Sequence, residues 1–240
     1  MLKLENGIMF AGAHSFRDHG LLLQQRHIGL PDKNKIIETV PFSNRQFDFS
    51  EVFGSQVYEE RELTYVFTLY HEAGHEALEA RRIRAVNWLM GYNRQMELED
   101  DAVEGFYFSG EVRNGIESSY FMGSGHYEIS VTFQCYPFKI SKDPEGSDIW
   151  DVFNFELDRV QEVDFSVNGV LAIGLANPGV VPVTPKVTAG AAMTISLGGT
   201  SYRFNRGTTK DDAFQFPVGD FELVVEGSGS LSFEFYREVL

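Results

Sequence analysis

The sequence predicts a mainly β protein, with an N-terminal β domain that contains one amphipathic helix and a C-terminal β-sandwich. Aromatic residues are abundant, with 21 phenylalanines and 10 tyrosines among 240 residues, and aromatic residues are enriched in strands. Apolar and polar residues alternate in many short segments, which is the period of a half-buried strand. Only one segment has the three- and four-residue spacing of a helix, so strands are expected to dominate.

The clearest strands lie in the first 140 residues. Residues 63–69 alternate between large apolar side chains and smaller ones, Phe106 and Phe108 begin a second strand, and residues 127–135 form a third. Cys135 ends this third run and is the only cysteine. A single cysteine excludes an intrachain disulfide and a CxxC-type zinc site, so we expect Cys135 to be a small buried apolar residue.

One helix is predicted from about residue 76 to residue 90. Glutamates lie in its first turns and arginines follow, an order that suits the helix dipole, and Gly91 is placed to cap its C-terminal end. Four apolar residues recur at three- and four-residue spacing and are expected to form its buried face. They are Ala80, Ile83, Val86 and Met90.

The pattern changes after the polar segment 142–147, which contains proline and glycine and is the best candidate for a domain junction. We therefore expect domains at 1–140 and 141–240. Short alternating runs follow, at residues 153–157, 193–197, 221–225 and 231–235. Gly198-Gly199 and Gly227-Ser228-Gly229 are predicted to be hairpin turns between strands. Closely spaced strands without a helix predict a β-sandwich.

Charge and hydropathy exclude several classes of protein. The formal net charge is -15, whereas nucleic-acid binding needs basic side chains that displace counterions from phosphates. The longest apolar stretch, residues 170–183, is interrupted by glycines and prolines, so no membrane-spanning helix is expected. The N-terminal residues lack the apolar run of a signal peptide. We expect a soluble protein made in a cytoplasm, without sequence-specific nucleic-acid binding or membrane insertion.

The segment His71-Glu72-Ala73-Gly74-His75 matches the HExxH motif of zinc metalloproteases. In those enzymes both histidines lie on one helix and bind zinc, and the glutamate activates a water molecule. Glu97 or Glu99 is a possible third ligand. The motif here follows a predicted strand, and glycine is unfavourable inside a helix by about 1 kcal/mol. A polar strand-to-helix connection is the main interpretation, and a zinc metalloprotease is the minor alternative.

Other catalytic patterns are missing from the sequence, which has no GxSxG elbow, phosphate-binding glycine loop or CxxC pair. His14, His19 and His27 are interpreted as surface or hairpin histidines, with Ser15 in a turn. The acidic runs 99–101 and 211–212 are interpreted as solvated turns. We therefore predict no catalytic, cofactor-binding or metal-binding residues, no cofactor and no enzymatic activity.

Several segments of the first 140 residues, in order and at similar spacing, resemble the distal tail (Dit) family of long, flexible-tailed bacteriophages. One is the strand that carries Tyr58, Arg61, Leu63, Tyr65 and Phe67, similar to the family pattern Y-x-x-R-x-L-x-Y-x-F. The others are Gly7-Ile8-Met9-Phe10-Ala11-Gly12, His14-Ser15-Phe16-Arg17-Asp18, Val40-Pro41-Phe42-Ser43, Phe47-Asp48-Phe49-Ser50, Asn87-Trp88-Leu89-Met90-Gly91, Phe106-Tyr107-Phe108-Ser109-Gly110 and Phe133-Gln134-Cys135-Tyr136-Pro137-Phe138.

The C-terminal half resembles the same family at fewer points. Asn177-Pro178-Gly179 is similar to the entry of the family's galectin-like sandwich, and Phe216-Pro217-Val218-Gly219 is similar to its closing hairpin. Asp220 follows where the family pattern leads to an asparagine. The resemblance implies that residues 141–240 form a galectin-like β-sandwich.

The resemblance also implies a function. Dit-like N-terminal domains form a hexameric ring, single or stacked, which joins the tail tube to the tail-tip and receptor-binding apparatus and leaves a channel for DNA. The implied partners are further copies of the chain, the major tail tube protein, the tape measure protein, the tail-associated tip protein and receptor-binding proteins, all in the virion. The alternative from another class is a carbohydrate-binding module that contacts host cell-wall glycans through the C-terminal sandwich.

Overall fold

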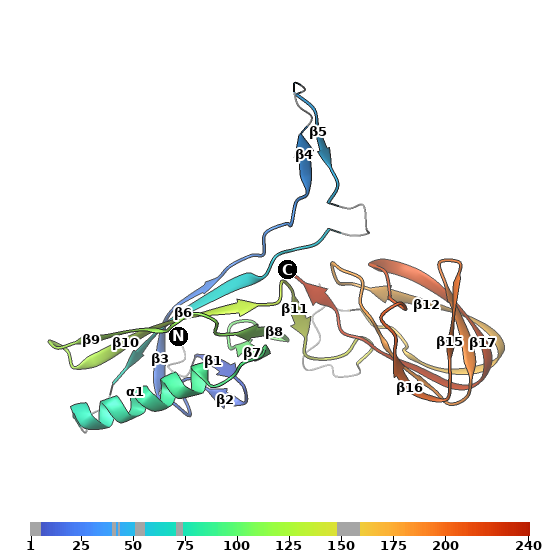
Figure 1. Cartoon of the computed structure of the whole chain (residues 1–240). Coiled ribbons are helices and arrows are strands. Elements are labelled where there is room, and N and C mark those ends of the chain that lie inside the picture. The colour runs from blue at the N-terminus through green and yellow to red at the C-terminus, as the bar shows by residue number, and fades with distance from the viewer. Residues whose placement is uncertain (1–5, 40–41, 43, 51–55, 71–73, 148–158) are drawn as a thin grey trace. The chain divides into compact units, whose positions relative to one another are not determined.

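The computed structural model describes residues 6–39, 42, 44–50, 56–70, 74–147 and 159–240. They divide into two compact units, residues 1–139 with residue 240, and residues 140–239. Each unit has its own cluster of buried apolar side chains. Strands predominate in both units and α1 is the single helix of the described residues, so the predicted mainly β class is confirmed (Figure 1).

The first unit contains a curved antiparallel sheet with the strand order β2-β1-β7-β8-β10-β6-β3, and β9 pairs with β10. The predicted strands at 63–69, 106–108 and 127–135 are confirmed as parts of β6, β8 and β10. The strands are β1 (Ile8–Phe10), β2 (Ala13–His14), β3 (Leu21–Ile28), β6 (Arg61–Leu69), β7 (Met96–Asp100), β8 (Phe106–Glu111), β9 (Glu117–Phe121) and β10 (His126–Cys135).

Alternation along β6 and β10 builds the first core. The two strands are antiparallel, with Leu63 opposite Phe133 and Tyr65 opposite Val131, so large side chains from both strands fall on the same face. All four are buried, at 0% or 1% exposed. Cys135 continues this row and is also fully buried, as its place in the alternating run predicts.

The helix α1 (His75–Met90) has the predicted length, and Gly91 follows its last residue with its N–H bonded to the Trp88 carbonyl. No helix of the described residues is long and apolar enough to cross a membrane. The predicted buried face is wrong, because Ile83 is 47% exposed and Met90 is 45% exposed. The structure buries Leu78, Ala85 and Leu89 instead. Apolar residues occupy more than one side of this helix, so spacing alone cannot select the side that meets the sheet.

Between β3 and β6 the chain leaves the sheet as a two-stranded arm, described at residues 35–39, 42 and 44–50, in which β4 (Ile37–Thr39) pairs with β5 (Gln46–Asp48) (Figure 1). At its base, the bridge between Lys33 and Tyr58 and two backbone hydrogen bonds hold the outgoing and returning segments together. The arm is therefore a continuation of the β3 and β6 pair away from the core.

The second unit contains a six-stranded antiparallel sheet with the order β15-β14-β17-β13-β16, and β12 pairs along β17. Its core is rich in phenylalanine, with Phe216 in ring contact with Phe214, Phe221, Phe233 and Phe235. The strands of the C-terminal part are β11 (Lys139–Ser141), β12 (Asp164–Asn177), β13 (Lys186–Ala189), β14 (Met193–Leu197), β15 (Thr200–Phe204), β16 (Gly207–Lys210), β17 (Gly219–Glu234) and β18 (Glu238–Val239).

The two predicted glycine turns differ in outcome. Gly198 and Gly199 have φ values of 59° and 85°, which suits a two-residue hairpin, and they join β14 to β15 as expected. Gly227-Ser228-Gly229 is not a turn, because β17 continues through it and stays paired with β12. The predicted run 153–157 lies outside the described residues.

The glycines of β17 mark a change of partner within the strand. Gly227 has φ of 154° and lies opposite Gly169, with φ of 89°. Before this point β17 pairs with β14, and after it β17 pairs with β13. Paired glycines allow a two-stranded ribbon to bend without a clash of side chains. A glycine-rich stretch in a sequence can therefore be the bend of one long strand as well as the turn between two short ones.

Replacing Gly227 with alanine is expected to destabilise the protein by about 2 kcal/mol. The new Cβ would lie 2.8 Å from Cγ of Met193, at a positive φ that other residues rarely adopt. Gly174→Ala in the neighbouring β12 is the control, because a Cβ there meets no atom within 4 Å. Urea unfolding followed by circular dichroism measures both, and equal midpoints for the two variants would contradict the close approach at Gly227.

The Cys135 thiol is expected to be unreactive in the folded protein. Burial raises its pKa to about 12, an effect that nearby Arg61 opposes, so the reactive thiolate is scarce at pH 8. One thiol per chain should react with a thiol-specific reagent in urea and almost none without it. Since folding favours the protonated thiol, this group's contribution to the free energy of unfolding falls as pH rises from about 9 to about 12. Rapid labelling at pH 8 without denaturant would contradict the burial.

Candidate functional site

The arm carries a cluster of exposed apolar side chains, among them Phe42, which is more exposed than any other large apolar residue of the described first unit. Phe42 is fully exposed, and four further large apolar residues of the arm are about half exposed. These are Ile36, Ile37, Phe47 and Phe49. A lone two-stranded ribbon is at best marginally stable in water, and clustered exposed apolar side chains mark interaction sites. The arm is therefore a candidate surface for contact with another protein.

Polar contacts fix the register at the base of the arm. Lys35 donates to an Asp48 carboxylate oxygen at 2.8 Å, and the other Asp48 oxygen accepts the Ser50 backbone N–H at 2.9 Å. The Ser50 hydroxyl in turn accepts the Ile36 N–H at 2.9 Å. These donors, Lys35 first, hold the pKa of the Asp48 carboxyl well below its usual range. The two strands thus keep their apolar residues in a defined arrangement.

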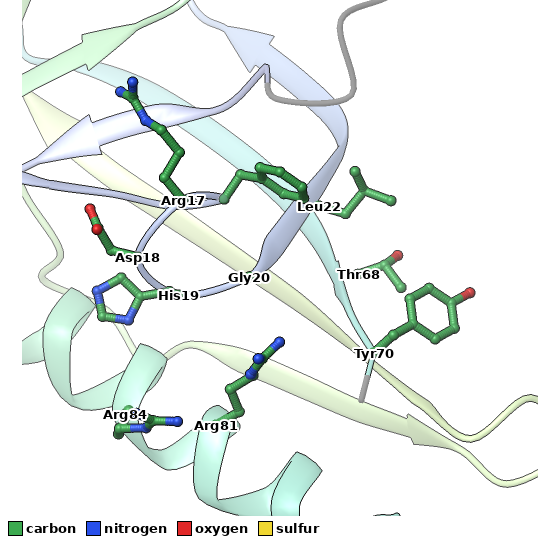
Figure 2. Close-up of a pocket in the computed structure, with 10 residues that line it drawn as sticks. Arg17, Asp18, His19, Gly20, Leu22, Thr68, Tyr70, Arg81 and Arg84 are labelled. Carbon is green, nitrogen blue, oxygen red and sulfur yellow. The ribbon is translucent and has the colours of Figure 1, made fainter. Parts of the chain in front are cut away.

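A hollow of about 560 Å³ lies between the turn that precedes β3 and the helix α1 (Figure 2). It is bordered by Arg17, Arg81 and Arg84, with Asp18 and His19 beside them, and is called the arginine hollow below. The His19 ring stacks on Trp88 with ring centroids 4.2 Å apart. Burial lowers the pKa of His19, and the Asp18 charge opposes that shift, so the arginines carry most of the positive charge.

A second hollow of about 560 Å³ lies at the other end of the β3 and β6 pair. Its border includes four carboxylates, Asp32, Glu59, Glu60 and Glu62, with Arg61 among them, and it is called the acidic hollow below. Arg61 itself is only 1% exposed and donates to the carbonyls of residues 29 and 137. Burial lowers the pKa of its guanidinium. The hollow therefore presents mainly negative charge to solvent.

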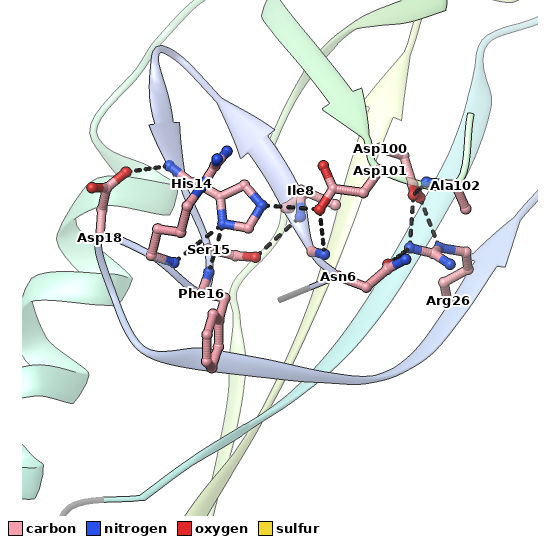
Figure 3. Close-up of polar contacts among 12 residues, drawn as sticks. Asn6, Ile8, His14, Ser15, Phe16, Asp18, Arg26, Asp100, Asp101 and Ala102 are labelled. Carbon is pink, nitrogen blue, oxygen red and sulfur yellow. Dashed lines mark hydrogen bonds and ion pairs between the residues drawn. The ribbon is translucent and has the colours of Figure 1, made fainter. Parts of the chain in front are cut away.

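Behind the surface of the first unit, the Asp100 carboxylate is fully buried and holds three elements together (Figure 3). It accepts from the Tyr65 hydroxyl at 3.0 Å and from Arg26 at 2.7 and 2.9 Å, and from the Ala102 N–H at 2.9 Å. Burial and the neighbouring Asp100 raise the pKa of Tyr65, so its hydroxyl remains a donor. The prediction that residues 99–101 form a solvated turn is wrong for Asp100.

His14 lies in a second part of this network, on β2 of the hairpin with β1. It is thus a hairpin histidine as predicted, but at 2% exposed it is not a surface one. Its Nδ1 accepts the N–H groups of Phe16 and Arg17 at 3.1 and 3.2 Å. Nε2 must then carry the proton and donates to Asp101 at 3.0 Å. Ser15 is also buried, and its hydroxyl accepts the Ile8 N–H at 3.0 Å (Figure 3). These contacts shape the turn that borders the arginine hollow.

His14 differs from the other two N-terminal histidines in its burial. His19 is half-buried and His27 is exposed, so only His14 contradicts the interpretation of this group as ordinary surface residues. Asp211 and Asp212 are exposed as predicted, and Asp211 accepts the Ala213 N–H at 3.0 Å. Sequence separation hides the role of His14, since its partner Asp101 lies 87 residues away.

Part of the HExxH motif, residues 71–73, lies outside the described residues. β6 ends at Leu69, and α1 begins at His75 with Gly74 as its N-cap, so the motif falls between a strand and a helix as predicted. The His75 ring lies 4.9 Å from the Tyr120 ring, while Glu97 and Glu99 belong to β7. Within the described residues, no three side chains of the types His, Cys, Asp and Glu are grouped to hold a metal ion.

No short-range pattern in the sequence predicts either charged hollow. The order of charges along α1 suits the helix dipole, and Arg17 lies more than sixty residues before the arginines of that helix. Folding brings them together because the turn 17–20 lies beside α1. In the second unit, every described phenylalanine and tyrosine is buried or half-buried, which leaves the carbohydrate-binding alternative no fully exposed aromatic ring among those residues.

Comparison with known proteins defines the fold. No protein-family model and no curated protein matches the sequence. Among solved structures, the Dit protein of phage SPP1 superposes with a TM-score of 0.68 at 14% sequence identity, over 98% of this chain and 99% of that chain. A chain of the phage P2 baseplate in its activated conformation with Ca matches with a TM-score of 0.44 at 10% identity, over 92% of this chain and 90% of that chain. The second score is too low to establish a common fold.

The chain is thus a mainly β protein of two units with one helix, and its fold is that of a phage hub protein. Specifically, it has the fold of SPP1 Dit, which is described as a paradigm of the hub adsorption apparatus in phages that infect Gram-positive bacteria. The resemblance to the Dit family in the sequence is therefore confirmed at the level of the fold. Its strand pattern from Tyr58 to Phe67 corresponds to β6, whose Leu63, Tyr65 and Phe67 are fully buried.

Replacing Asp100 with alanine is expected to destabilise the first unit by about 3–5 kcal/mol, because it leaves Arg26 and the Tyr65 hydroxyl without their buried acceptor. Tyr65→Phe removes one hydrogen bond and should cost only about 1 kcal/mol. Asp212→Ala, at an exposed position, is the control and should change stability by less than about 0.5 kcal/mol. Urea unfolding measures all three, and an Asp100→Ala midpoint equal to that of the control would refute this role.

Proposed function

We propose that this protein is a structural subunit of a bacteriophage tail tip, in which copies of the chain form a hexameric hub ring. The ring joins the tail tube to the tail-tip and receptor-binding apparatus and leaves a channel through which DNA passes. The superposition on SPP1 Dit over nearly the whole of both chains carries the proposal. The Dit-like sequence segments support it independently of the tertiary structure.

The arm supplies a physical reason for assembly. Its exposed phenylalanines, among them Phe42 and Phe47, lose contact with water only if another surface covers them. When an arm of one copy contacts a different surface of the next copy, the contact is heterologous, and such contacts form closed rings when the rotation between copies closes. Apolar area on a projecting ribbon therefore favours a ring of identical chains.

The two units have separate roles in this proposal. Residues 1–140 form the ring, and residues 141–240 form a galectin-like sandwich to which receptor-binding or other baseplate proteins attach. The ring contacts the major tail tube protein on one side and the tail-associated tip protein on the other, with the tape measure protein in the channel. The subunit is made in the host cytoplasm and resides in the virion, and its role is structural rather than enzymatic.

Ring formation can be measured directly by light scattering after gel filtration and by negative-stain microscopy. The wild-type chain is expected to form closed rings of six copies, single or stacked. A variant with Phe47→Ser and Phe49→Ser is expected to stay folded and to weaken assembly by about 10- to 100-fold, because two apolar side chains are removed from the contact.

Val170→Ser is the matched control, since this exposed residue lies in the second unit, 68% exposed, and outside the proposed contact. It should form rings as the wild type does. Circular dichroism establishes that the arm variant is folded. A wild-type chain that remains a monomer at all accessible concentrations would overturn the proposed ring.

A further inference from the structure

The two charged hollows of the first unit lie at opposite ends of the same pair of strands. Leu22 and Thr68 are paired in β3 and β6 and border the arginine hollow. Gly29 and Glu62 border the acidic hollow and are joined by a backbone hydrogen bond of 2.9 Å. The length of β3 between these points separates the hollows by about 20 Å. The first unit thus presents a positive and a negative hollow, and the paired strands β3 and β6 hold them at a fixed distance from each other.

The arginine hollow has guanidinium groups that lack acidic partners within the part of the chain that the structure describes. No side-chain hydrogen bond or ion pair joins Arg17, Arg81 or Arg84 to a described residue, whereas Arg82 on the same helix is paired with Glu79. Asp18, whose carboxylate accepts the His14 N–H at 2.7 Å, offsets only one of the three positive charges. Three cations around one hollow repel one another and favour an incoming anion.

The turn before β3 leaves room for one of these side chains. Gly20 has φ of 67°, and a Cβ at this position would lie 2.7 Å from a guanidinium nitrogen of Arg81. Arg81 is half-buried by this close approach, while Arg17 and Arg84 are exposed. Figure 2 shows Arg81 and Arg84 on α1 and Arg17 on the facing turn. The arginines therefore border the hollow from two separate elements.

The acidic hollow holds carboxylates that are available for an external cation. Glu60 is paired with Arg113, and Glu62 accepts from Gln134 at 2.5 Å. Asp32 and Glu59 contact each other through a backbone hydrogen bond of 2.9 Å, and neither carboxylate has a side-chain partner among the described residues. Both side chains are exposed. They are the carboxylates best placed to receive an arginine.

We propose that the exposed carboxylates of Asp32 and Glu59, on the border of the acidic hollow of one copy, enter the arginine hollow of a second copy and pair with Arg81 and Arg84. The charges are complementary, and the anion that the arginine hollow favours is supplied by the chain itself. This inference rests on the proposed ring and specifies one of its contacts. Because the two hollows differ, the contact is head-to-tail. A row of copies therefore has an unused arginine hollow at one end and an unused acidic hollow at the other, and these are used only if more copies are added or the row closes into a ring.

Two complementary variants test the contact. Arg81→Glu with Arg84→Glu destroys the arginine hollow and keeps the acidic one, and Asp32→Lys with Glu59→Lys does the reverse. Each variant alone places like charges together and is expected to weaken self-association by at least about 100-fold. Mixed in equal amounts, the variants are complementary at both kinds of contact, one with the native charges and one with the charges exchanged, and are expected to assemble together in alternation. Light scattering after gel filtration measures the mass.

The charge-matched control is Arg203→Glu with Arg206→Glu, two exposed arginines of the second unit, which should assemble as the wild type does. Raising the salt concentration should weaken the mixed assembly, since the distance beyond which exposed charges are screened falls from about 10 Å at 0.1 M to about 3 Å at 1 M. Circular dichroism establishes that the variants are folded.

The outcomes separate this inference from the proposed ring. If the wild type forms rings and both variants also form them alone, the ring stands and the hollow contact is overturned. If both variants fail to assemble and their mixture stays monomeric, the contact is also overturned, because complementary charges at the two sites then do not restore assembly. If the variants assemble only when mixed and the wild type forms open oligomers without closed rings, the contact stands and the ring is overturned.

Discussion

The first unit depends on the buried Asp100 carboxylate, which fixes the curvature of its sheet. β7, where Asp100 lies, is separated in the sheet from β6 and β3 by β8 and β10. Its contacts with Tyr65 and Arg26 nonetheless join these strands directly, which requires the sheet to curl until they meet. A buried charge is costly unless its hydrogen bonds are satisfied. An arrangement of the strands that separated Asp100 from Tyr65 and Arg26 would therefore be destabilised. The core side chains of β6 and β10 then fill the space that the curve encloses.

This curvature determines where the arm and the two charged hollows lie. The curled sheet ends at β3, and the arm leaves the sheet where β3 ends and returns where β6 begins. His14 and Asp101, adjacent to the Asp100 contacts, hold the turn that precedes β3. One end of β3 therefore meets the turn and α1, and forms the arginine hollow, while the other end meets the base of the arm and forms the acidic hollow. Surface charge in this unit follows from the positions of buried groups.

The HExxH segment illustrates why a motif needs its structural context. Zinc chemistry requires both histidines one turn apart on a formed helix, whereas here β6 ends before the segment and α1 begins at its last residue. The net charge likewise does not describe the local surface charge. The chain has an overall excess of acidic residues, yet three arginines lie together around one hollow. Chemistry and recognition depend on which side chains lie next to one another in the folded protein. The overall composition does not contain this information.

The sequence by itself determined the features that arise from local periodicity. These include the strands β6, β8 and β10, the extent of α1, the burial of Cys135 and the Gly198-Gly199 hairpin. Alternation and three- to four-residue spacing indicate which secondary structure a short segment forms. The order of the Dit-like segments along the chain indicates the resemblance to that family. Only the tertiary structure decided which side of α1 is buried, and that Gly227 marks a bend. It also decided that His14 and Asp100 are internal, because their partners lie tens of residues away and no short-range pattern records them.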